Sequence, residues 1–301
     1  MRPQLLAPIV AFAFSLQALA QQVPDTAFNY TPRTPTYARG KGPVVLLDEA
    51  HHNFHRMDGR YMAFARTLEN DGYVVLPGSA PFTSEQLKQA RILVIANALG
   101  DDGPWVLPTG HAFTSEEAAA VEAWVRAGGS LFLIADHMPF GGAARRLGRA
   151  FGFNWINGYA MRDDGGPERF SRKAGNLVPN AITDGASLED RIDSVMVFTG
   201  SAFIAPPEAT PILKLDSDYS ILLPEQAGTF TDTTAWIEGR YFLNAAMLEH
   251  GKGRVVCSGE AAMFSAQRHG PQLQPVGMNQ PGAEQNPRLL LNIIRWLDRR
   301  L

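Results

Sequence analysis

An apolar run that ends in acids and histidines is the first place where this sequence could carry out chemistry. The stretch VVLLDEAHHNFH, residues 44–55, contains the letters DEAH, which nucleic-acid helicases place at a strand end to hold the magnesium of ATP. Such an ATPase also needs a phosphate-binding loop of the form G-x-x-x-x-G-K-[ST]. The two GKG segments, 40–42 and 251–253, lack the hydroxyl residue after the lysine. We therefore interpret DEAH as a chance match and expect no ATP partner.

Acids, amides and imidazoles also follow three further apolar runs, at 92–96, 131–135 and 254–257. If these runs are parallel strands, their carboxyl ends share one edge, where doubly wound sheets bind their ligands. The sequence therefore predicts a site at that edge. Its candidate residues are Glu49, His51, His52, His55, Asn97, Asp136, His137 and Glu260.

Acid–base chemistry is the first use for this set, because a histidine beside a carboxylate can activate water or orient a hydroxyl. We expect His51 or His137 to act as general base or metal ligand, with Asp136 orienting that imidazole. Glu260 would be a second acid or ligand. The pocket would be lined by His52, His55 and Asn97.

Metal binding is the second use, and imidazoles with carboxylates suit Zn, Mn or Fe. The metal candidates are His51, His55, Asp136 and His137. The spacing H-H-x-x-H matches no H-E-x-x-H metalloprotease helix, so the cofactor stays open. Plain structural roles also stay open, since acids at strand ends often cap loops and histidines often donate to backbone carbonyls.

No nucleophile stands out. A G-x-S-x-G elbow is absent from the sequence. The single cysteine, Cys257, lies inside an apolar run and is typical of an inert packed thiol. One cysteine also excludes an internal disulfide, and the net charge of −3 gives no reason to expect a nucleic-acid partner.

Strand and helix patterns alternate at both ends of the chain. We expect strands at 43–47, 73–76, 92–96, 131–135 and 254–257, and helices at 57–70, 84–89, 241–249 and from 286 to about 299. A further helix follows Thr114, which stands in capping-box relation to Glu117. Because the apolar runs are uninterrupted, they suit parallel strands covered on both faces. The expected class is α/β: an open, mostly parallel sheet flanked by helices.

The chain divides into three predicted parts. Residues 1–20 read as a signal peptide cut after Ala20, which predicts a periplasmic or secreted protein. Residues 21–42 read as a loose leader. Residues 43–301 form one α/β domain with an antiparallel, β-rich insertion at about 153–238. The mature chain has no apolar run long enough to cross a membrane.

Three segments carry a family resemblance: TSEEAAAVEAWVRAGGSLFLIADH, GKGRVVCSGEAAMFSAQ and NPRLLLNIIRWLD. Together they resemble the class I glutamine amidotransferase-like superfamily, in its poorly characterised exported branch related to ThuA-like proteins. The resemblance covers roughly 43–150 and 240–300 and implies a flavodoxin-like sheet with a site at its carboxyl edge. Amidotransferases carry a nucleophilic cysteine where this chain has Asp136 and His137. The resemblance therefore excludes thiol-dependent glutamine hydrolysis.

Two functions remain as hypotheses. The first is an exported hydrolase-like enzyme that acts on a small polar substrate, with carbohydrate as one option. The second is a non-catalytic module of the cell envelope that binds a ligand or an envelope protein. Turnover by the purified protein would favour the first hypothesis, and a stoichiometric protein partner without turnover would favour the second.

Overall fold

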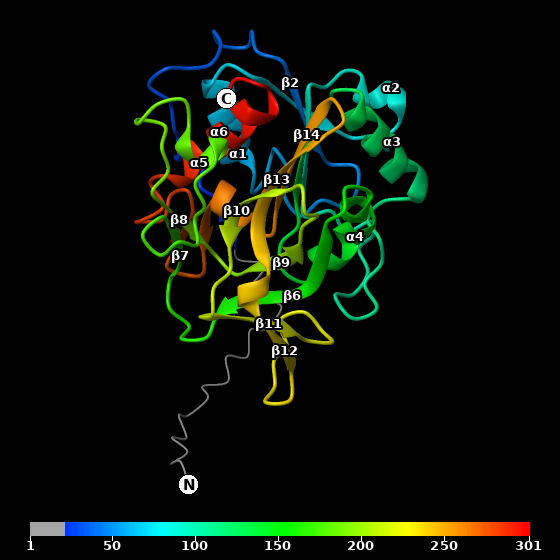
Figure 1. Cartoon of the computed structure of the whole chain (residues 1–301), viewed down its shortest axis with the longest axis vertical. Helices are drawn as coiled ribbons and strands as arrows, with labels where there is room; N and C mark the ends of the chain where they lie inside the picture. Colours follow the sequence, from blue (N-terminus) through cyan, green and yellow to red (C-terminus); the bar gives the residue numbers. More distant parts are fainter. Residues whose placement is uncertain (1–21) are drawn as a thin grey trace.

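The computed structural model describes residues 22–301, so the predicted signal peptide lies outside the described part of the chain (Figure 1). The largest sheet has 11 strands. One half of it is parallel, in the order β14-β5-β4-β2-β3. These strands are β2 (Val44–Asp48), β3 (Val74–Gly78), β4 (Ile92–Ala96), β5 (Ser130–Ile134) and β14 (Gly253–Ser258).

The other half of the sheet is antiparallel, which corrects the expectation of a mostly parallel sheet. The segment 153–238 supplies five strands of this same sheet. Four of them continue it from β13 outward, in the order β9, β6, β11 and β12, and the fifth, β10, also pairs with β13. They are β6 (Asn154–Arg162), β9 (Gly200–Ile204), β10 (Thr210–Lys214), β11 (Tyr219–Leu223) and β12 (Ala235–Glu238), joined to β14 by β13 (Leu243–His250).

The predicted helix at 241–249 is wrong, because this segment is the strand β13. Its Ala, Leu and Met residues favour a helix in isolation. In the molecule the segment lies between β14 and β10 and buries four of its eight residues. Backbone pairing on both sides overrides the local preference.

Helices cover both faces of the sheet. In Figure 1, α1 (Met62–Asn70) and α6 (Asn286–Leu297) lie on one side, and α3 (Ser115–Arg126) and α4 (Phe140–Ala150) on the other. Short helices α2 (Ser84–Leu87) and α5 (Ala181–Asp184) complete the layers. The predicted helix at 57–70 starts only at Met62, and the predicted capping box of Thr114 and Glu117 is confirmed at α3.

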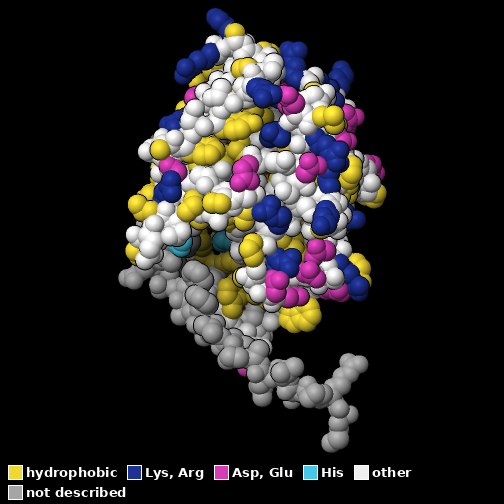
Figure 2. Space-filling view, turned by 90° about the vertical axis from the view of Figure 1, so that its left-hand side faces the viewer, with side chains coloured by type: hydrophobic (Ala, Val, Ile, Leu, Met, Phe, Trp, Pro, Cys, Tyr) yellow, Lys and Arg dark blue, Asp and Glu magenta, His cyan; other side chains and the backbone are white. Residues whose placement is uncertain are grey.

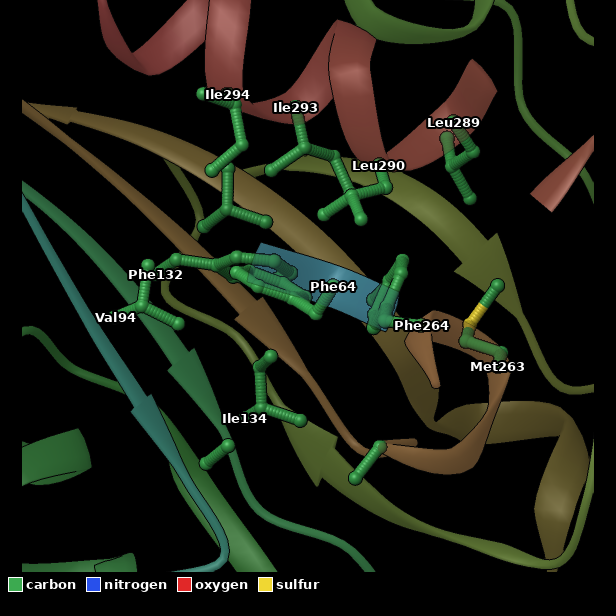
Figure 3. Packing of buried hydrophobic residues seen from close by; sticks show 14 of the residues in the cluster. Phe64, Val94, Phe132, Ile134, Met263, Phe264, Leu289, Leu290, Ile293 and Ile294 are labelled. Carbon is green, nitrogen blue, oxygen red and sulfur yellow. The ribbon is translucent and has the colours of Figure 1, made fainter. Parts of the chain in front are cut away.

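Alternate residues of each buried strand enter different cores, as the period of two requires. In β5, Phe132 and Ile134 face α6, whereas Leu131 and Leu133 face α3 and α4. Figure 3 shows the first core, where Leu290 and Ile293 of α6 lie above the sheet. The predicted strands at β2, β4, β5 and β14 are thus confirmed as buried, whereas β3 at the edge leaves Leu76 exposed.

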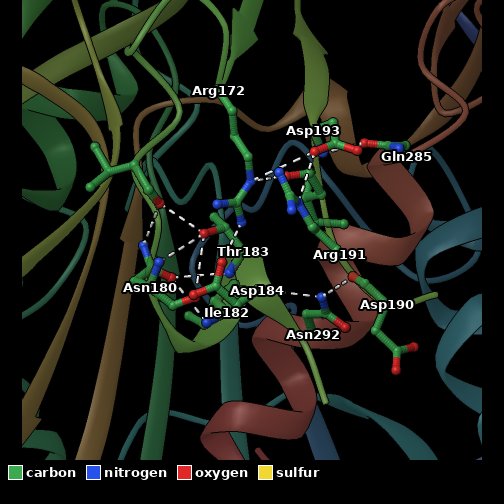
Figure 4. A network of polar contacts seen from close by, with 12 residues as sticks. Arg172, Asn180, Ile182, Thr183, Asp184, Asp190, Arg191, Asp193, Gln285 and Asn292 are labelled. Atoms are coloured by element: carbon green, nitrogen blue, oxygen red, sulfur yellow. Dashed lines mark hydrogen bonds and ion pairs between the residues drawn. The ribbon is translucent and has the colours of Figure 1, made fainter. Parts of the chain in front are cut away.

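Two small sheets lie beside the main one, and a polar network joins the insertion to α6. The strand β7 (Glu168–Ser171) pairs with β8 (Ser194–Val197), and β1 (Val23–Pro24), β15 (Ala266–His269) and β16 (Gln274–Gly277) form the other sheet. Asn292 of α6 donates to the carbonyls of Ile182 and Asp190, both at 2.8 Å (Figure 4). Arg172 pairs with Asp184 at 2.6 Å. These contacts fix the segment that carries β7 and β8 against α6.

Candidate functional site

The strands β2, β4, β5 and β14 are parallel neighbours, so their carboxyl ends meet at one edge of the sheet. Two groups of ionisable side chains lie there. We name them the paired cluster (Asp48, His51 and Glu117) and the acid cluster (Asp136, Glu168 and Glu260). The predicted residues divide between these two clusters and the loops around them.

The paired cluster holds its histidine from both sides. Nδ1 of His51 lies 2.9 Å from Oδ1 of Asp48, and Nε2 lies 2.8 Å from Oε1 of Glu117. Burial opposes protonation, but the hydrogen bonds and charges of the two carboxylates raise the pKa of His51 above 6.5. An imidazolium with both nitrogens bonded has no lone pair to offer. The expected role of His51 as general base or metal ligand is therefore not supported.

Glu49 and His52 also have partners of their own. The carboxylate of Glu49 accepts from the Met57 amide at 2.7 Å and pairs with Arg56 at 2.9 Å. These bonds fix the loop after β2, so Glu49 closes that loop instead of joining the acid cluster. His52, 44% exposed and with a left-handed φ of 49°, contacts Asp102 at 3.0 Å.

The acid cluster joins carboxyl groups from three distant segments. Asp136 follows β5, Glu260 follows β14, and Glu168 begins β7 in the insertion. Asp136 is 6% exposed and Glu260 is fully buried. Burial raises the pKa of Asp136 to about 7, with the Glu168 charge adding to the shift. Burial and the charge of Asp136 raise the pKa of Glu260 well above its ordinary value.

Glu168 completes this cluster and was missed in the sequence. Burial first, and then the charge of Glu260, raise its pKa to about 8. Like charges in a dry site cannot all ionise together, so the cluster titrates as a unit. Glu168 lies in the turn-rich segment GGPERF, and no periodicity or strand end there could have identified it.

The turn between β8 and β9 supplies donors to two of the three acids. The Phe198 amide donates to Oε2 of Glu260 at 3.0 Å, and the Thr199 hydroxyl donates to Oε1 of Glu168 at 3.3 Å. Thr199 has φ 66°, which is an unfavourable conformation for a β-branched residue. Strained backbone of this kind often lies at functional sites.

Two glycines bring that turn against the end of β14. A Cβ on Gly200 would lie 2.3 Å from the Gly259 carbonyl oxygen, and a Cβ on Gly259 would lie 2.4 Å from the Ser201 carbonyl oxygen. Only glycine allows this approach. The close contact places the Phe198 amide within reach of Glu260, the next residue after Gly259.

Asn97 connects the ends of β4 and β5. Its Oδ1 accepts from the Asp136 amide at 2.9 Å, and its Nδ2 lies 3.2 Å from Nδ1 of His55. Burial, Arg60 and His137 lower the pKa of His55 to about 3, so this imidazole is neutral. His55 is 3% exposed and packs against Tyr61 at 4.5 Å. It therefore supports the site from behind and does not line an open pocket.

His137 is the partly exposed histidine of the site. Its Nδ1 lies 2.9 Å from the Met138 carbonyl oxygen, which can only accept, so Nδ1 carries the proton. Burial lowers the pKa of His137 to about 4, which leaves Nε2 with a lone pair at neutral pH. The ring stacks on Tyr159 with centroids 4.4 Å apart. His137 can thus accept a hydrogen bond from a substrate hydroxyl.

Within residues 22–301, no group of three or more His, Cys, Asp or Glu side chains has the geometry of a metal site. The metal candidates His51 and His137 already use three of their four ring nitrogens on protein atoms. Cys257 is buried, and burial raises its pKa, as expected for a packed thiol. Ser201 donates to the Ala135 carbonyl at 2.7 Å and is not a free nucleophile.

The molecular surface agrees with the modest net charge. Figure 2 shows basic and acidic side chains interspersed over one face, and histidine side chains at a hollow bordered by hydrophobic residues. No helix in the described part of the chain has the length and apolar character needed to cross a membrane.

Comparison with known proteins gives the fold and little more. No family model and no curated protein matches the chain. Among solved structures, the mmIFT52 N-terminal domain is similar with TM-score 0.59 and 13% identity over 85% of this chain and 97% of that domain. A ThuA-like protein from Bacteroides uniformis has TM-score 0.44 and 12% identity, covering 90% and 94% of the two chains.

A glycosidase is also among the similar structures. The exo-beta-1,4-mannosidase Op5Man5 from Opitutaceae bacterium strain TAV5 has TM-score 0.40 and 13% identity, over 85% of this chain but only 36% of that longer one. The first similarity supports the α/β fold. The other two have lower TM-scores and do not indicate a function.

Proposed function

We propose that the acid cluster is the active centre of an exported, hydrolase-like enzyme that acts on a small polar substrate, with carbohydrate as the leading class. One observation carries the proposal. Two buried acids, Asp136 and Glu260, and half-buried Glu168 form one cluster in which burial and like charges raise all three pKa values. Carboxyl groups with pKa values near neutrality are suited to donate and accept protons at pH 7.

Each residue has a defined role in this proposal. Asp136, with a pKa of about 7, removes a proton from the attacking water. Glu168, with a pKa of about 8, donates a proton to the leaving group. Fully buried Glu260, whose pKa is raised well above its ordinary value by burial and by the charge of Asp136, keeps its own proton. Nε2 of His137 accepts a bond from a substrate hydroxyl.

Export and ancestry belong to the proposal as well. Export is supported by the N-terminal sequence pattern alone. Descent from the class I glutamine amidotransferase-like superfamily is supported by the sequence resemblance and by the parallel strands β2, β4, β5 and β14. The chemistry cannot be thiol-dependent, since Cys257 is buried inside β14.

The test is a hydrolysis screen of the purified mature protein. Nitrophenyl glycosides of several sugars, with nitrophenyl acetate for comparison, would be assayed with wild type, Asp136→Asn and Glu168→Gln. Glu85→Gln, an exposed acid in α2, is the matched control. We expect both site variants to lose turnover and the control to retain it. Equal turnover in all four proteins would disprove the assignment.

The binding-module hypothesis has one observation in its favour. Both oxygens of Glu260 already accept backbone N–H groups, from Phe198 at 3.0 Å and Met263 at 3.2 Å. This is the environment of a structural cap as much as of a catalytic acid. If no substrate in the screen turns over and a pull-down yields one stoichiometric partner, this second function is the better one.

A further inference from the structure

The loops that follow β2 and β4 enclose a concave site, and the mechanism proposed above does not use it. It is a pocket of about 500 Å³, which we name the aromatic pocket. Its volume falls in the range of small-molecule sites. The pocket is lined by aromatic, acidic and basic side chains, among them Phe54, Trp105, His52, Asp102, Arg56 and Arg60.

Aromatic rings connect this pocket to His137. Phe54 and Trp105 contact each other with centroids 5.7 Å apart, and Phe140 lies 5.3 Å from Trp105. On its other side, Phe140 lies 6.0 Å from the ring of His137. One ring, Phe140, therefore separates the aromatic pocket from the partly exposed histidine of the site.

The backbone holds the aromatic wall in place. The Phe54 amide donates to the Asn97 carbonyl at 2.9 Å, and the Trp105 carbonyl accepts from the Ala227 amide at 2.9 Å. The guanidinium of Arg60 lies 3.9 Å above the Phe54 ring. A pocket whose walls are fixed in this way needs little ordering on binding.

The polar rim carries groups of both signs. Arg56 is paired with Glu49 at 2.9 Å, and His52 is paired with Asp102 at 3.0 Å. The rim thus offers a donor group on Arg56 and an acceptor on Asp102. A ligand with several hydroxyl groups can accept from the first and donate to the second. The C–H face of such a ligand can lie against the indole of Trp105.

We propose that the aromatic pocket is a sugar-binding subsite that holds a neutral pyranose ring, placing the adjoining part of the substrate at His137. This inference deepens the proposed function and depends on it only for the chemistry at the neighbouring acids. Binding in the pocket itself does not require turnover.

Saturation-transfer NMR tests the subsite with free D-glucose, D-galactose, D-mannose and D-xylose, and with D-glucuronate as the charged comparison. Wild type should transfer saturation to ring C–H protons of at least one neutral sugar. Trp105→Ala and Asp102→Ala should weaken that binding about tenfold. Trp236→Ala is the matched control, because Trp236 is 61% exposed on β12 and outside the pocket.

The outcomes separate the two proposals. No transfer from wild type, transfer to glucuronate alone, or equal transfer in Trp105→Ala would overturn the subsite. Circular dichroism checks the fold of Trp105→Ala, and the mostly exposed Asp102 gives an independent variant if that protein misfolds. Asp136→Asn should keep sugar binding. Binding without turnover in wild type would reject the proposed chemistry and leave the subsite intact.

Discussion

The paired cluster and the acid cluster lie at the same edge of the same sheet, yet their electrostatics are opposite. His51 stands between two carboxylates, 2.9 Å from Asp48 and 2.8 Å from Glu117, so every charge there has a partner of opposite sign. In the acid cluster, the charges of Asp136 and Glu168 each act on a neighbouring acid and raise its pKa. The first arrangement stabilises the fold, and the second raises its energy at neutral pH.

The difference helps to distinguish buried polar groups that stabilise the fold from buried polar groups that can take part in acid–base chemistry. In the paired cluster, the two carboxylates around His51 raise its pKa and favour its protonated form. A buried group of like charges must hold protons that it can release, which is the property of an acid–base site. Histidine beside carboxylate is therefore a weaker functional signal here than carboxylate beside carboxylate.

The largest expected effect is on activity. Asp136→Asn should reduce turnover of any substrate found in the screen by about 10²- to 10⁴-fold, the usual contribution of a general base. The same change in the paired cluster, Asp48→Asn, should reduce turnover far less in protein that remains folded. Comparable losses in both variants, measured as kcat/KM, would remove the distinction between the clusters.

The second effect is on the free energy of unfolding, and here the paired cluster should be the more sensitive site. His51→Ala leaves Asp48 and Glu117 buried without their cation, and breaking such a pair costs about 3–5 kcal/mol. His137→Ala removes a neutral ring with one backbone hydrogen bond and should cost less. Urea unfolding of both variants measures the difference. A smaller cost for His51→Ala than for His137→Ala would contradict the structural role of the paired cluster.

The third prediction concerns pH. The folded pKa of Asp136, about 7, lies above the ordinary 3.8, so its stabilising contribution is complete below pH 3.8 and is lost as pH rises through 7. Asn cannot ionise and escapes this loss. The stability of Asp136→Asn relative to wild type should therefore increase between about pH 4 and 7 and level off above pH 7, with a slope of at most about 1.4 kcal/mol per pH unit. A flat difference would show that Asp136 is ionised throughout.

The smallest expected effect is on stability, and it separates the two contacts that Glu117 makes. Its Oε1 contacts His51, and its Oε2 accepts from the Thr114 amide at 3.0 Å in the capping box of α3. Thr114→Ala removes one half of that box and should cost about 1 kcal/mol. Thermal melting of Thr114→Ala and wild type measures this loss of stability. A loss as large as that of His51→Ala would mean that the cap, rather than the charge pair, dominates this region.

Features that depend on residues close together in the chain could be predicted from the sequence, and features that depend on distant residues could not. The apolar runs before Asp48, Asn97 and Asp136 identified parallel strands, because a strand buried on both faces needs apolar residues throughout. The segment 241–249 was predicted as a helix because its residues favour one locally. Only its pairing with β14 and β10 in the sheet makes it a strand. Glu168 was missed because nothing near it in the chain marks it as a neighbour of Glu260.

What the sequence determined by itself is the parallel half of the sheet, the capping of α3 and the placement of acids and histidines at strand ends, since each depends on neighbours a few residues apart. Tertiary structure alone decided which of those groups meet. It gave His51 two carboxylate partners, brought Glu168 to Glu260 from the insertion, and set His137 against Tyr159. Electrostatic partners are chosen by distance in space, and that distance exists only once the strands have paired.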